Sequence, residues 1–147
     1  MNFLFGIIIL FIFIIKNINC EVLNLTENLE SAIKDENAYV IKFYSEMCGS
    51  CKEFAPTFDD YAKKVNKKLN VGIVNIDNKT GMEQATKVGA MDGGIPAVYL
   101  IISKTKKGII PIFDGDGDLP TALSMLKKTR TLVEGLNINN YGKYLKK

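Results

Sequence analysis

Hydrophobic and polar residues alternate along the chain in blocks that predict strands and helices in turn. Five short runs rich in β-branched and aromatic residues, bounded by polar residues, glycine or proline, are typical of strands. We expect the last two to pair as a hairpin with Pro111 at a sheet edge, because proline cannot donate a ladder hydrogen bond. The predicted strands span residues 21–25, 38–44, 71–77, 97–102 and 108–113.

Between the strands, four segments carry apolar residues at helical spacing or residues typical of helix boundaries. We expect Thr26 and Asp118 to act as N-caps of the first and last helices, and Pro56 to kink the second. The predicted helices span residues 27–34, 49–69, 81–88 and 119–133. The core-facing side chains expected in the last helix are Leu119, Ala122, Leu123, Leu126 and Val133.

This order of elements predicts the fold class. Strands and helices alternate early, and a hairpin followed by a helix comes late, which indicates an α/β fold with a mixed central β-sheet flanked by helices on both faces. Apolar residues make up 47% of the chain and charged residues 24%, as is usual for a globular protein. We expect one domain over residues 21–135 and a loose C-terminal tail over residues 136–147.

The first 20 residues have the pattern of a signal peptide. Residues 3–15 carry no charge, and this run is shorter than the ~18–20 apolar residues of a membrane span. We expect cleavage after Cys20, no stable membrane span afterwards, and transit through an oxidising secretory compartment. Two glycosylation sequons, at Asn24 and Asn78, are compatible with that route.

The positive charge of the chain does not favour nucleic-acid binding. The net charge is +3, and the lysines are spread in pairs along the chain, with Arg130 as the only arginine. A nucleic-acid interface would instead need clustered arginine and lysine with interleaved aromatic residues. We interpret the lysines as solvated helix and loop faces, and we expect no nucleic-acid partner.

Cys48 and Cys51 stand two residues apart, a spacing used for zinc binding, for a structural staple or for thiol–disulfide exchange. A structural zinc site needs four ligands, and the chain has no histidine and only Cys20 besides the pair. A staple would close a very small loop and would constrain the unfolded chain little. The aspartates near residue 116 lack the glycine and glutamate spacing of a calcium loop, so we expect no metal.

The position of the pair favours exchange chemistry. Cys48 follows a predicted buried strand and begins a predicted helix, where unpaired N–H groups and the helix dipole stabilise a thiolate. The thiolate is the attacking species in disulfide exchange. Cys51, one helical turn later, is expected to be the resolving thiol. Gly49 is expected to allow a tight turn, and Ser50 to leave room for a substrate.

The segment VIKFYSEMCGSCKEFAP (residues 40–56) resembles the active-site region of the thioredoxin family, in which a strand, C-G-x-C-K, a helix and a proline follow one another. The segments VGIVNID and GGIPAVYL resemble the third strand and the cis-proline loop of that family. The resemblance implies the thioredoxin fold, a Cys48–Cys51 disulfide in the oxidised form and a cis bond before Pro96. It also implies that Met47, Gly49, Ser50, Ile95 and Pro96 contact the substrate.

Four residues depart from the family pattern. Met47 stands where family members usually have tryptophan, and Ser50 where disulfide isomerase domains have histidine. Lys42 replaces a buried acid, and Ile73 replaces the lysine that usually pairs with it. If neutral, Lys42 could accept a proton from Cys51; if charged, it could favour the Cys51 thiolate; or its amine simply reaches solvent.

We therefore expect a thiol–disulfide oxidoreductase of the secretory pathway, in the endoplasmic reticulum lumen, secreted or in a vacuolar lumen. Its expected partners are disulfide-containing protein substrates and a dithiol electron partner, and no cofactor is needed. The alternative hypothesis is an accessory or adaptor subunit of a folding complex or a protein-export translocon, with little catalytic role.

Overall fold

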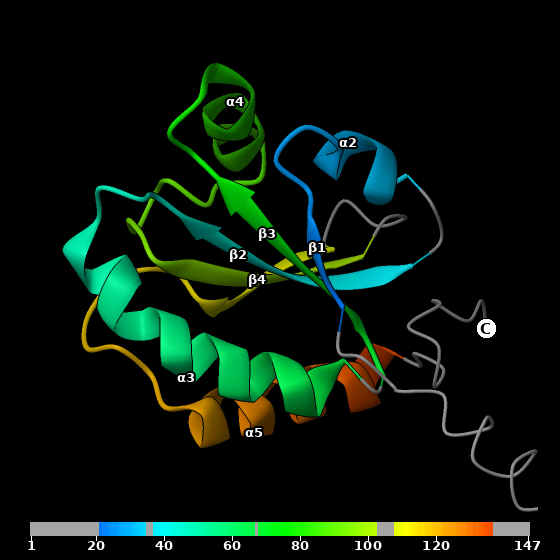
Figure 1. The fold of residues 1–147 in the computed structure, drawn as a ribbon. Coiled ribbons are helices and arrows are strands. Elements are labelled where there is room, and N and C mark those ends of the chain that lie inside the picture. Colours follow the sequence, from blue (N-terminus) through cyan, green and yellow to red (C-terminus); the bar gives the residue numbers. More distant parts are fainter. Residues whose placement is uncertain (1–20, 35–36, 67, 103–107, 137–147) are drawn as a thin grey trace, which may run out of the picture.

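The computed structural model describes residues 21–34, 37–66, 68–102 and 108–136. These residues form a central β-sheet covered by helices on both faces, as predicted (Figure 1). The expectations for residues 1–20 and 137–147 lie outside the described residues. None of the helices in the described part of the chain combines the length and the apolar content that a membrane crossing needs.

The sheet of the described residues has five strands in the order β1-β3-β2-β4-β5. β1, β3 and β2 are parallel to one another, whereas β4 pairs antiparallel with both β2 and β5. The predicted mixed sheet and hairpin are therefore confirmed. Pro111 lies in the edge strand, as expected. The strands are β1 (Val22–Asn24), β2 (Ala38–Tyr44), β3 (Asn70–Asn75), β4 (Ala97–Ile102) and β5 (Ile109–Phe113).

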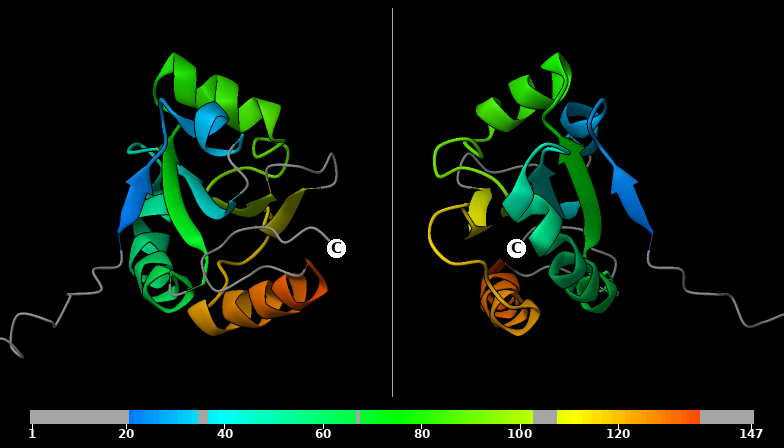
Figure 2. Two further views of the ribbon diagram at one scale, coloured as in Figure 1. Left: turned by 90° about the vertical axis from the view of Figure 1, so that its right-hand side faces the viewer. Right: turned by 60° about the vertical axis from the view of Figure 1, so that its left-hand side comes forward.

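The helices lie in two pairs, one on each face of the sheet (Figures 1 and 2). α3 and α5 pack on one face, and α2 and α4 on the other, so that β2 is buried on both sides. Because strand side chains alternate between faces, Val40 and Lys42 point toward α3, and Ile41 and Phe43 toward the opposite face. The helices are α2 (Leu29–Ala32), α3 (Gly49–Val65), α4 (Lys79–Lys87) and α5 (Ala122–Leu136).

The predicted N-cap of the first helix is wrong. α2 is a single short turn that begins at Leu29, and Asn28 stands at its N-cap position. Thr26 is instead buried, and its hydroxyl accepts a hydrogen bond of 3.0 Å from the N–H of Asn75. A tertiary contact to the end of β3 therefore uses the oxygen that would have capped the helix.

The start of the last helix also differs from the prediction. α5 begins at Ala122, and Thr121 Oγ1 caps it by accepting from the N–H of Ser124 at 3.2 Å, so Asp118 is not the cap. Pro120 explains the shift, because a residue that precedes proline is disfavoured in helical conformation. Leu123 is 64% exposed, so its predicted inward position is wrong, and Met125, at 1% exposure, is buried instead. Leu119, Ala122, Leu126 and Val133 do pack against the core.

The other helix ends differ from the predictions by a few residues. α3 ends at Val65 rather than at residue 69, although Leu69 is still buried, at 2% exposure. Pro56 lies inside α3, with its side chain exposed. α4 begins two residues earlier than predicted because Asn78 caps it, accepting from the N–H of Gly81 at 2.7 Å.

Candidate active site

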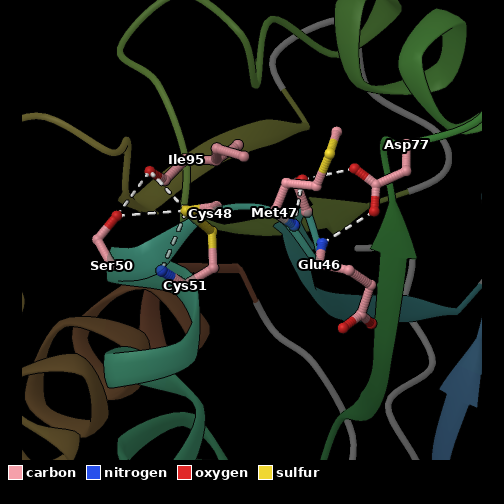
Figure 3. The surroundings of a disulfide bond; sticks show 8 residues. Glu46, Met47, Cys48, Ser50, Cys51, Asp77 and Ile95 are labelled. Carbon is pink, nitrogen blue, oxygen red and sulfur yellow. Dashed lines mark hydrogen bonds between the residues drawn. A yellow bond between two sulfur atoms is a disulfide. The ribbon is translucent and has the colours of Figure 1, made fainter.

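The two cysteines lie where β2 ends and α3 begins. Cys48 has extended backbone and is the N-cap of α3, and its sulfur is bonded to that of Cys51 in a disulfide (Figure 3). The buried strand β2 before the pair and the helix α3 after it fix the positions of both cysteines relative to the sheet. The helix N-terminus that the sequence predicted at Cys48 is therefore present.

The two sulfur-bearing residues differ in exposure. Cys51 is 4% exposed and faces the core beneath α3, whereas Cys48 is only half-buried. Met47 is 85% exposed, and Gly49 and Ser50 are also exposed. An incoming molecule therefore meets Cys48 and its neighbours first.

Three polar groups surround the sulfur of Cys48. The N–H of Cys51 donates to it at 3.1 Å, and Ser50 Oγ lies 3.3 Å away. The carbonyl oxygen of Ile95 lies 3.8 Å from the same sulfur and 3.5 Å from Ser50 Oγ (Figure 3). The structure thus brings Ile95 to the cysteine pair, as predicted, and the bond between Ile95 and Pro96 is cis.

Gly49 does not play the backbone role expected of it. It is the first residue of α3, and its φ is not positive. A Cβ atom there would meet no atom within 4 Å. The backbone therefore does not require glycine at this position, and the missing side chain instead leaves open space beside the disulfide.

The loop that carries Ile95 is held close to the turn after β5. Gly94 has φ of 109° and Gly115 has φ of 91°, a region that favours glycine. A Cβ on Gly115 would overlap the backbone of Gly94, so the two segments approach each other directly. The Asp-Gly segment after Phe113 therefore supports the loop.

Within the described residues, no group of three His, Cys, Asp or Glu side chains is arranged to hold a metal ion.

Lys42 lies under α3 and is 7% exposed. Its Nζ sits 4.7 Å from the ring centre of Phe58 and 5.0 Å from that of Tyr44, and none of the ion pairs among the described residues involves it. Burial lowers the pKa of Lys42, and the nearby charges of Asp59 and Glu46 partly oppose this change. The side chain is thus neither paired with a carboxylate nor extended freely into solvent.

Ser45 and Asp77 belong to the site, although the sequence did not single them out. Asp77 follows β3, and its carboxylate accepts from Ser45 Oγ at 2.5 Å and from the N–H of Glu46 at 2.8 Å (Figure 3). These two hydrogen bonds, led by that from Ser45, lower the pKa of Asp77. The carboxyl ends of parallel strands lie at the same edge of a sheet. Because Ser45 follows β2 and Asp77 follows β3, this rule could have predicted from the sequence that the two residues lie close together.

Comparisons with known proteins agree with this geometry. A model of the family described as Thioredoxin matches residues 21–115. A thioredoxin of Rhodospirillum rubrum is 28% identical over 86 residues, which is 56% of this chain and 79% of that protein. Protein disulfide-isomerase A4 of Rattus norvegicus is 28% identical over 90 residues, which is 60% of this chain and only 13% of that protein.

Solved structures show the same fold. The first thioredoxin domain of mouse protein disulfide-isomerase A4 aligns with a TM-score of 0.57 and 20% identity, covering 76% of this chain and 73% of that one. The J-Trx1 fragment of ERdj5 aligns with a TM-score of 0.58 and 22% identity, covering 71% and 47%. The predicted thioredoxin fold is confirmed.

Proposed function

Because this chain belongs to the thioredoxin family, we propose that Cys48 and Cys51 carry out thiol–disulfide exchange on protein disulfides. The observation that carries this proposal is the contrast between the two sulfurs. Cys48 is half-exposed at a helix N-terminus beside the carbonyl of Ile95, and Cys51 is buried directly behind it. An accessible attacking sulfur with a hidden second sulfur is the arrangement that two-step exchange needs.

In the reductive direction, the Cys48 thiolate attacks one sulfur of a substrate disulfide. A mixed disulfide forms between Cys48 and the substrate, and the other substrate sulfur leaves as a thiolate. The Cys51 thiolate then attacks the Cys48 sulfur, which forms the Cys48–Cys51 disulfide and releases the second substrate thiol. Two electrons pass from the dithiol to the substrate, and a dithiol protein or glutathione must return them.

Residues around Cys48 are proposed to hold the substrate. The N–H of Cys51 and the hydroxyl of Ser50 both reach the Cys48 sulfur and can donate to it as a thiolate. Met47 offers an exposed, flexible apolar side chain for peptide contact. Ile95, with Pro96 after it, presents backbone groups next to the sulfur, where an extended substrate strand can bind.

Lys42 is proposed to tune the second step. Burial disfavours its charged form, but Asp59 and Glu46 act in the opposite sense, and two aromatic rings face the amine. A cation on the core side of α3 favours a thiolate at Cys51, which faces the same core. Lys42 would thus replace, by electrostatic attraction, the proton transfer for which the family uses an acid.

We place this activity in the secretory pathway. The predicted signal peptide over residues 1–20 supports the proposal. The similarity extends both to a bacterial thioredoxin and to rat protein disulfide-isomerase A4, so it does not by itself select a compartment.

Trapping of substrates tests the exchange mechanism. The Cys51→Ser variant, expressed in the native cell, should accumulate mixed disulfides on Cys48 because the second attack is blocked. The Cys48→Ser variant is the matched control and should trap nothing. Equal trapping by the two variants, or an empty trap with Cys51→Ser, would contradict catalysis at this pair.

The adaptor role remains the second candidate, because the acid and the tryptophan typical of the family are replaced by Lys42 and Met47. In that case the exposed surface beside Cys48 holds partners without exchange. Rescue of a deletion phenotype by the Cys48→Ser/Cys51→Ser double variant, at the level of the unmodified protein, would favour the adaptor. Failure of that rescue would favour exchange.

A further inference from the structure

The turn of residues Ser45, Glu46 and Met47 joins β2 to the cysteine pair and is held largely by side chains. Each backbone N–H of the turn from Glu46 to Cys48 donates to an identified oxygen. The N–H of Glu46 donates to Asp77 Oδ2 at 2.8 Å, and the N–H of Met47 donates to Ser45 Oγ at 3.0 Å. One bond closes the turn through the backbone, from the N–H of Cys48 to the carbonyl of Ser45 at 3.3 Å.

The Ser45 hydroxyl links the turn to Asp77. Its oxygen accepts from Met47 while its hydrogen is donated to Asp77 Oδ1 at 2.5 Å. Only a side chain that both donates and accepts can do this. Ser45 is 7% exposed, so its hydroxyl is enclosed by protein, whereas the carboxylate of Asp77 also faces solvent.

Asp77 is itself fixed on the frame of the sheet. The N–H of Ile76 donates to the carbonyl of Tyr44 at 2.9 Å, which continues the pairing of β2 and β3 beyond both strands. The N–H of Asp77 donates to Asn75 Oδ1 at 2.8 Å. Both carboxylate oxygens of Asp77 accept hydrogen bonds from the turn. The position of the turn therefore depends on the position of β3.

We propose that Asp77 and Ser45 are positioning residues of the exchange site. Together they hold the turn so that Met47 stands in solvent and Cys48 enters α3 with its sulfur facing the carbonyl of Ile95. The inference rests on the proposed exchange function and deepens it. Neither side chain reacts; each sets where the attacking sulfur lies relative to the bound substrate strand.

The test is a double-mutant cycle with Ser45→Ala, Asp77→Asn and the two combined. Each single variant should lower kcat/KM for reduction of insulin about ten-fold, the effect of one lost hydrogen bond to a charged group. Because both changes break the same network, the double variant should be no slower than the slower single one within two-fold. Ser45→Thr keeps the hydroxyl and should restore most of the activity.

Two further measurements separate positioning from other roles. Reduction of a small aromatic disulfide, which needs no extended contact with Met47 or Ile95, should change less than two-fold in the single variants. The pH midpoint of the attack should stay within 0.3 units in Ser45→Ala, as an order-of-magnitude limit for ~2-fold changes. Asp60→Ala, which removes an exposed carboxylate that pairs with Lys64, is the matched control and should behave as the unmodified protein.

Each outcome decides the matter. Full activity of Ser45→Ala and Asp77→Asn, or losses that multiply in the double variant, would overturn the positioning role. A shifted pH midpoint in Asp77→Asn alone, with Ser45→Ala unaffected, would overturn it in favour of a direct effect of charge. If Cys48→Ser were as active as the unmodified protein, the exchange function itself would fail, and this result is independent of the cycle.

Discussion

The two halves of the candidate site differ in what holds them. The outer half consists of Ile95 and the turn Ser45–Cys48. The turn is exposed at Met47 and is linked by hydrogen bonds to Asp77. The inner half consists of Lys42 in β2 and of three residues of α3 that face the sheet, Cys51, Phe54 and Phe58, and these side chains are at most 7% exposed. Hydrogen bonds define the outer half, whereas packing defines the inner half.

This difference fits the proposed exchange, in which the two sulfurs have different tasks. The outer sulfur would meet a substrate without any movement of the core. The inner sulfur would stay out of reach until a mixed disulfide had formed next to it. We therefore expect changes in the inner half to affect stability and resolution, and changes in the outer half to affect substrate binding.

The largest predicted effect concerns stability. Phe58→Ala removes a ring that is 1% exposed and packs against Phe54 and Tyr61, and it should lower the free energy of unfolding by about 3–5 kcal/mol. Met47→Ala, its counterpart in the outer half, should change that free energy by less than about 0.5 kcal/mol. Urea unfolding of the oxidised proteins measures both. Similar losses in the two variants would erase the distinction between the halves.

The next effect concerns the second chemical step. Lys42→Met removes the amine that we propose acts as a cation, without adding a base, and it should slow resolution of the mixed disulfide about ten-fold, as one unit in the pKa of a thiol would. Stopped-flow measurement of the release of the second substrate thiol gives this rate, with the first attack as internal control. Lys42→Asp, which restores the acid of the family, should change the rate as well. Unchanged resolution in both variants would remove Lys42 from the mechanism.

The inner half could be predicted from the sequence more fully than the outer half. β2 has the predicted bounds, because every residue of its run except Lys42 is apolar or aromatic, and helical spacing places Phe54 and Phe58 on one face of α3. The resemblance to the thioredoxin family supplied Pro96 and its cis bond. Pattern and family were sufficient where packing alone decides the position of a side chain.

Sequence reasoning was less successful where a polar side chain chooses between a local and a distant partner. Thr26 was expected to cap a helix but bonds to Asn75. Ser45 and Asp77 are 32 residues apart, so no local pattern connects them. The exposed position of Leu123 was missed because the buried face of α5 follows Met125 and Thr129, and Leu123 lies outside that face.

A smaller effect is expected in substrate binding at the outer half. Met47→Ala should raise KM for a protein disulfide about five-fold, with kcat unchanged, because roughly 1 kcal/mol of apolar contact is lost. Met47→Leu keeps the apolar volume and should leave KM within two-fold. Steady-state reduction of insulin measures both constants. A fall in kcat at constant KM would mean that Met47 acts in the chemical step rather than in binding.

The smallest effect is expected at acid pH, where the outer half alone should respond through Asp77. Its pKa is lowered in the folded protein by hydrogen bonds from Ser45 and Glu46, so this carboxylate stabilises the fold above its ordinary value of 3.8 and ceases to do so as pH falls through the lower folded pKa. The stability of the unmodified protein relative to Asp77→Asn should therefore decrease below pH 3.8 and stay level above it. Unfolding by urea across this range measures the difference. A difference that grew on acidification would show a raised pKa and would contradict the hydrogen bonds between Asp77 and the turn.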